Sequence, residues 1–75
     1  MNADELNSGI LDAWSNGDGP RLAELYAIAG NSMLESGLED EGCFFLTQAY
    51  ILALENGLEI ADPLHAELVR HGREE

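Results

Sequence analysis

The sequence contains no lysine, and its three arginines face fifteen aspartates and glutamates, for a net charge of −12 at pH 7. Such a surface repels nucleic-acid phosphates and anionic lipid head groups, so we expect no direct binding to nucleic acid or to a membrane. Without lysine there is no Schiff-base chemistry and no phosphate-anchoring lysine, and no glycine-rich phosphate loop is present. Solubility, or a salty cell interior, is the simplest explanation of the acidic excess, and a basic partner is the alternative.

Cysteine and long apolar runs are also scarce. The single cysteine, Cys43, excludes an internal disulfide, and a free thiol fits a reducing compartment. No apolar run approaches the roughly 20 residues that span a bilayer, and the start lacks the basic and apolar stretches of a signal peptide. We therefore expect a cytoplasmic protein. The 75 residues allow one domain, 1–75, whose small core gives it modest stability.

The sequence does contain helical periodicity, and the stretch 39–55 is its centre. It opens with three acids, carries apolar residues on nearly every face and stops at Asn56-Gly57. A helix that is apolar almost all round must be covered by its neighbours, and at least two are needed here. One stripe of the expected helix contains Cys43, Leu46, Tyr50 and Ala53, and another contains Phe45, Ala49 and Leu52.

Three further helices are expected around this one. The first runs over 3–15 and stops at Asn16-Gly17. The second begins at Asp18-Gly19-Pro20 and ends near Gly37. The fourth begins with Asp62 as its cap and Pro63 at its first helical position, and it ends at Gly72. The apolar faces expected are Leu6, Ile10, Ala13 and Trp14 in the first helix, Leu22, Leu25, Tyr26, Ala29 and Met33 in the second, and Leu64, Leu68 and Val69 in the fourth.

Short connections between these helices favour antiparallel neighbours, so the predicted fold is all-α, a small bundle of four short antiparallel helices. Gly30 lies inside the second helix, where glycine is unfavourable by propensity. A physical reason to keep it is the close approach of a neighbouring helix.

Residues 22–55 form a 34-residue helix–turn–helix unit with a characteristic spacing. Tyr26-x2-Ala29-Gly30-x2-Met33 is followed by Gly42-x3-Leu46. This resembles W-x2-L-G-x2-Y followed by A-x3-F, the pattern of a tetratricopeptide repeat. Aromatic positions hold Met33 and Leu46, and Leu54 replaces the closing proline. The resemblance implies a surface that holds another protein, a groove lined by exposed residues of the second helix, and no catalytic residues.

A strongly acidic, four-helical chain of this length also resembles an acyl carrier protein. In that family the attachment serine stands in a D-S-L motif at the start of a helix. Here the corresponding stretch is Asn31-Ser32-Met33, and Ser32 is predicted to lie inside the second helix. The carrier function, with Ser32 as the modified residue, is therefore kept as an alternative.

Cys43, His65 and His71 are the obvious metal-ligand types, but we expect no metal site and no cofactor. His65 and His71 lie about 240° apart around one helix, so they cannot share an ion. Cys43 stands among bulky apolar residues, where thiols behave as inert hydrophobes. A core thiol and exposed histidines are predicted. Glu67 and His71 are spaced for an acid–base pair, but such helical pairs are usually weak ion pairs, so we predict no enzyme activity.

Aromatic side chains supply the last candidate site. Most of them fall on helical faces that suit core packing, whereas Phe44 is expected at the edge of the apolar face of its helix. We predict a partner or dimer surface that includes Phe44, Tyr50 and Trp14. The favoured function is a small acidic protein–protein interaction module, an adaptor or regulatory subunit. Its partner is another protein, or a second copy of the chain in a homodimer. The alternatives are the acyl carrier and an acidic mimic of nucleic acid that inhibits a basic protein.

Overall fold

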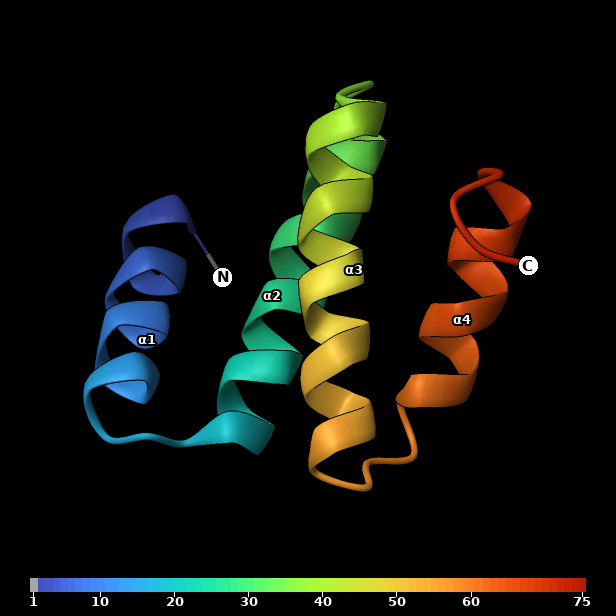
Figure 1. Cartoon of the computed structure of the whole chain (residues 1–75). Helices are drawn as coiled ribbons and strands as arrows, with labels where there is room; N and C mark the ends of the chain where they lie inside the picture. Colours follow the sequence, from blue (N-terminus) through green and yellow to red (C-terminus); the bar gives the residue numbers. More distant parts are fainter. Residues whose placement is uncertain (1) are drawn as a thin grey trace.

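The computed structural model describes residues 2–75, and within them it contains four helices and no strand (Figure 1). This confirms the all-α prediction. The helices are α1 (Ala3–Ser15), α2 (Gly19–Glu35), α3 (Glu39–Glu55) and α4 (Ala61–Arg70).

All four helices end in the same way, at the glycines that the sequence indicated. Gly17, Gly37, Gly57 and Gly72 have φ values of 65°, 83°, 63° and 71°, in the left-handed region that glycine adopts most easily. In each case the next N–H donates to the carbonyl five residues earlier, as in the 2.9 Å bond from Asp18 N to Ala13 O. This pattern is the Schellman motif, which satisfies carbonyls that the helix leaves free.

The helix starts agree with the sequence at α2 but not at α4. The carboxylate of Asp18 accepts a hydrogen bond of 3.1 Å from Arg21 N, which makes Asp18 the cap of α2. Asp62 was expected to do the same for α4, and this prediction is wrong. A turn over 58–61 continues into the helix, so that α4 begins at Ala61 after Ile60, and Asp62 already lies inside its first turn.

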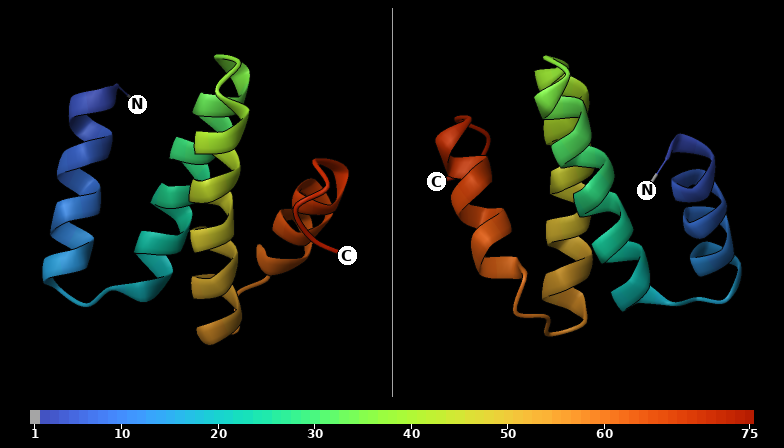
Figure 2. Two further views of the ribbon diagram at one scale, coloured as in Figure 1. Left: turned by 45° about the horizontal axis from the view of Figure 1, so that its top comes forward. Right: turned by 180° about the vertical axis from the view of Figure 1, so that it is seen from behind.

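Successive helices run antiparallel and pack mainly on their neighbours in the sequence. α1 packs on α2, α2 on α3 and α3 on α4 (Figures 1 and 2). The described part of the chain is correspondingly flat, with extents of 32 × 28 × 14 Å. As a consequence α2 and α4 run in the same direction on α3, and α1 stands at the outer side of α2.

The buried residues form two clusters within this flat arrangement. The cluster between α3 and α4 contains Cys43, Leu46, Ala49, Ala53, Ala61, Leu64 and Leu68. The cluster between α1 and α2 contains Ala13, Leu22 and Leu25, with Leu52 of α3 against it. Leu25, Leu46 and Leu68 have the largest fully buried side chains; Leu25 belongs to the second cluster and Leu46 and Leu68 belong to the first.

The contact between α2 and α3 is close because two glycines meet there. A Cβ added to Gly30 would lie 2.8 Å from Leu46 Cδ2 and 2.9 Å from the carbonyl oxygen of Gly42. This confirms the expectation that Gly30 allows a neighbouring helix to approach.

The coverage of α3 is less complete than its composition indicated. α2 and α4 flank it, but Phe44, Ile51 and Leu54 remain exposed. The prediction that neighbours cover nearly every face of this helix is therefore wrong. A single flat layer of four helices gives α3 only two extensive neighbours, and its outer apolar residues face solvent.

Candidate functional site

A groove of about 570 Å³ runs between α2 and α4 and is open to solvent along one side. Ala27 and Ile28 line it from α2, and Pro63 and Leu64 from α4, with Ile60 at the end where α4 begins. The polar side chains that line it are Glu24, Asn31 and Glu67. The groove exists because α2 and α4 both pack on α3 without packing extensively on each other.

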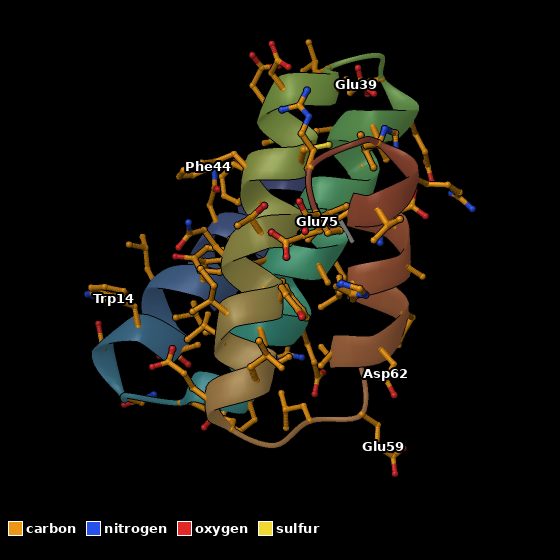
Figure 3. All side chains as sticks on the ribbon, turned by 45° about the vertical axis from the view of Figure 1, so that its right-hand side comes forward. Trp14, Glu39, Phe44, Glu59, Asp62 and Glu75 are labelled. Atoms are coloured by element: carbon orange, nitrogen blue, oxygen red, sulfur yellow. The ribbon has the colours of Figure 1, made fainter. Side chains whose placement is uncertain are left out.

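The three residues predicted to form a partner or dimer surface are not brought together. Phe44 is 59% exposed and Trp14 is 69% exposed. Figure 3 shows both projecting outward on the side of the molecule away from α4. Tyr50 instead packs against the α3–α4 core and lies over the ring of His65, with 5.5 Å between the ring centroids. Phe44 and Trp14 therefore share an exposed side that Tyr50 does not join.

The exposure of Trp14 differs from its expected place on the apolar face of the first helix. Ala13 carries the buried position of α1, and Leu6 and Ile10 are half-buried beside it. Trp14 lies at the margin, where it lines a shallow hollow of about 250 Å³ with Leu52. Because α1 touches α2 along only one narrow face, a residue next to that face stays outside the core.

A network of charged side chains joins the start of α3 to the end of α4. Nδ1 of His71 lies 2.6 Å from a carboxylate oxygen of Glu39, and its Nε2 lies 3.3 Å from one of Glu67. Hydrogen bonding to Glu39, followed by that to Glu67, raises the pKa of His71. Arg73 adds a second link by donating to Asp40 at 2.6 Å.

We call this network, which links α3 to α4, the clasp; His71 lines none of the three grooves described, whereas Glu67 also lines the groove between α2 and α4. The spacing of Glu67 and His71 in the sequence indicated their pairing, whereas Glu39 was noted only as one of the three acids that open the stretch 39–55. The missing partner lies 32 residues away in the sequence, so no local pattern could have indicated it.

The remaining chemistry-bearing residues occupy separate places. Cys43 is buried in the core as predicted, and its burial raises the pKa of its thiol. His65 and His71 are half-buried rather than exposed, because one lies against Tyr50 and the other against two carboxylates. Among residues 2–75, no three His, Cys, Asp or Glu side chains gather in a way that would hold a metal ion.

Ser32 is exposed and lies inside α2, near its end, as the sequence predicted. Its hydroxyl borders a second groove of about 250 Å³, which opens where α1 diverges from α2. This is not the position at a helix start that the resemblance to acyl carrier proteins requires.

Over the described residues, no helix combines the length and the apolar character needed to cross a membrane. Comparison of the chain with protein-family models, with curated proteins and with solved structures found no significant match.

Proposed function

We propose that this chain is a protein–protein interaction module that holds a segment of another protein in the groove between α2 and α4. The observation that carries the proposal is the groove itself, in which five of the eight lining residues are apolar, and two of these, Ile28 and Pro63, are exposed to solvent. Burying such side chains is favourable at roughly 25 cal/mol per Å². The resemblance of residues 22–55 to a tetratricopeptide unit implies the same kind of surface.

The shape of the groove favours a polypeptide over a small molecule. Sites for small molecules usually enclose most of the ligand surface. This groove is open along one side and extends over residues 24–31 of α2, which is about 10 Å at 1.5 Å per helical residue. An open trough of that length suits two turns of a helix or a few residues of an extended segment.

The test is native mass spectrometry of the protein isolated gently from its source cells. Wild type is compared with Ile28→Lys, in the groove, and with Val69→Lys, an exposed position of α4 outside it. We expect a second polypeptide at fixed ratio with wild type and Val69→Lys, and its loss with Ile28→Lys. Circular dichroism checks that both variants fold.

Two outcomes would contradict the proposal. A second polypeptide that stays bound to Ile28→Lys would place the interaction elsewhere, with the exposed side of Phe44 and Trp14 as the next candidate. If every preparation contains only the monomer or the homodimer, without a second polypeptide, the proposal that the chain binds another protein is wrong.

The mass spectra also test the acyl carrier alternative, and the salt dependence of partner binding tests the nucleic-acid mimic. An added mass of the size of phosphopantetheine on Ser32 would support the carrier function, and its absence would dismiss it. Acidic residues occur on all four helices, in the connections and at the C-terminal end. An inhibitor that uses this charge to mimic nucleic acid would lose its partner steeply as salt is raised, whereas an apolar groove would lose it weakly.

A further inference from the structure

The groove between α2 and α4 carries charge of one sign on both of its walls. Glu24 stands on the α2 wall and Glu67 on the α4 wall, and none of the described residues that line the groove is basic. The other polar lining group is the neutral side-chain amide of Asn31. The inference drawn from this arrangement rests on the proposed function and concerns the chemistry of the partner.

The two carboxylates lie at opposite ends of the groove. α2 and α4 run in the same direction, as Figures 1 and 2 show, and they contribute residues 24–31 and 60–67. Glu24 therefore stands at the end where α4 begins, and Glu67 at the end near Asn31. Seven residues at 1.5 Å each offset the two carboxylates by about 10 Å along the groove.

Of the two carboxylates, that of Glu24 makes the weaker contacts with basic residues of the chain. Arg21 Nη1 is 3.8 Å from its carboxylate, which is beyond hydrogen-bond distance, and the side chain is 57% exposed. Glu67 already contacts Arg70 and His71, and its side chain is 25% exposed. A cation that approaches Glu67 competes with these two residues, so Glu24 offers the stronger attraction.

The net charge also indicates whether the groove binds a second copy of this chain or a different protein. Each copy carries a net charge of −12, so two copies repel each other, and the groove offers its own carboxylates to any partner. The C-terminal Glu75 does not fill the groove, because its carbonyl oxygen lies 3.0 Å from His65, which does not line it.

We propose that the groove binds a basic amphipathic segment of another protein. Its apolar side chains lie between Ile28 and Leu64, and two Lys or Arg side chains about 10 Å apart face Glu24 and Glu67. The apolar contacts supply most of the affinity, and the carboxylates select a basic partner and reject an acidic one.

The experiment uses three synthetic helical peptides of equal length with the full protein. The first has leucines on one face flanked by lysines, the second replaces the lysines with glutamates, and the third replaces the leucines with serines. Fluorescence anisotropy gives the affinities, and amide chemical shifts of ¹⁵N-labelled protein locate the binding. Glu24→Gln is the test variant, and Glu41→Gln is the control, with the same charge change at an exposed position of α3 outside the groove.

We expect the leucine–lysine peptide to bind with shifts confined to residues 24–31 and 60–67, and the other two peptides to bind far more weakly. Glu24→Gln weakens binding about two- to fivefold, the range of an exposed ion pair, and Glu41→Gln leaves it unchanged.

Other results overturn the proposal in distinguishable ways. Equal binding of the glutamate peptide in the groove removes the basic partner but keeps the groove as a binding site. Shifts scattered over the molecule, with equal weakening by Glu24→Gln and Glu41→Gln, reduce the effect to general attraction by acidic charge. If none of the three peptides binds in the groove, and the cellular partner stays bound to the Ile28→Lys variant, the proposed function is wrong as well.

Discussion

Gly30 of α2 and Gly42 of α3 face each other where their helices come closest, and a Cβ on either would lie 2.9 Å from the carbonyl oxygen of the other. The atoms that would clash are backbone atoms, which cannot move without shifting a whole helix. This contact sets the distance between α2 and α3, and therefore the position of one wall of the groove.

Replacing Gly30 with alanine is expected to destabilise the fold. Alanine improves helix propensity by about 1 kcal/mol, but overpacking a tight contact costs typically about 1–3 kcal/mol. The expected result is a net loss in the free energy of unfolding, measured by urea denaturation. Gly9→Ala is the control, because its Cβ would meet only the flexible side chain of Leu25, at 3.2 Å. A Gly30→Ala protein as stable as Gly9→Ala would contradict the close approach.

Asp18 and Asp62 both precede a proline in the sequence, but the structure gives only Asp18 a capping bond. Asp18→Ala is therefore expected to lower the free energy of unfolding by about 1 kcal/mol. Asp62→Ala should cost less than about 0.5 kcal/mol, because it removes no capping hydrogen bond. Thermal denaturation of the two variants compares them directly. Equal losses would mean that Asp62 caps the helix and that α4 begins at Pro63, two residues later than Ala61.

The hydrogen bonds of His71 with Glu39 and Glu67 predict that stability falls as the pH rises above about 6.5. The folded state raises the pKa of His71 above its ordinary value of 6.5, so folding favours the protonated imidazole. This contribution is fully present below about pH 6.5 and is lost as the pH rises through the folded pKa. Urea denaturation of wild type and His71→Gln across this range measures the difference.

Glu39→Gln provides the companion to that experiment. Hydrogen bonding to Glu39 is the largest cause of the raised pKa, so this variant should lose much of the pH dependence. If wild type, His71→Gln and Glu39→Gln change in parallel with pH, the clasp contributes nothing to the linkage.

The excess of acidic residues predicts that the melting temperature rises between low and moderate salt. Fifteen acids and three arginines repel one another on balance, and salt screens this repulsion over a Debye length of about 10 Å at 0.1 M. Salt also weakens the ion pairs of the clasp, such as His71 with Glu39 and Arg73 with Asp40, but these involve few of the fifteen acids. Differential scanning calorimetry from about 10 mM to about 150 mM salt tests the prediction. A flat response would mean that self-repulsion is unimportant.

Phe44 and Leu46 lie two residues apart in α3, and substitutions at the two positions are expected to have very different effects on stability. Leu46 is fully buried, so Leu46→Ala should cost about 2–5 kcal/mol. Phe44→Asp should change the free energy of unfolding by less than about 1 kcal/mol, because the ring is mostly exposed. If light scattering shows a dimer of the wild type, Phe44→Asp should dissociate it and Val69→Asp should not. A dimer that survives Phe44→Asp would exclude this surface.

Local signals in the sequence account for most of the fold. The glycine stops, the start of α2 at Asp18-Gly19-Pro20 and the close approach at Gly30 depend on residues near one another or on the conformational freedom of one residue. They were therefore readable without a structure. The start of α4 was not, because a turn over 58–61 leads into the helix before the Asp62-Pro63 signal.

The candidate site was less accessible to the same reasoning. Helical periodicity identified apolar faces, but it could not tell which apolar residues would stay uncovered in a flat layer, so Trp14 was placed both on the apolar face of the first helix and on the predicted partner surface. The groove depends on how α2 and α4 sit side by side on α3, and the clasp joins residues 32 apart. Both are tertiary relations, for which a single sequence carries no direct signal.

The sequential packing of the helices also bears on how quickly the chain can find its structure. Every extensive helix pair consists of consecutive elements, so each contact closes only a short loop. Chains with such local contacts have low contact order and fold in microseconds to milliseconds. The hairpin of α2 and α3 can form first, and α1 and α4 can then dock independently on its two sides.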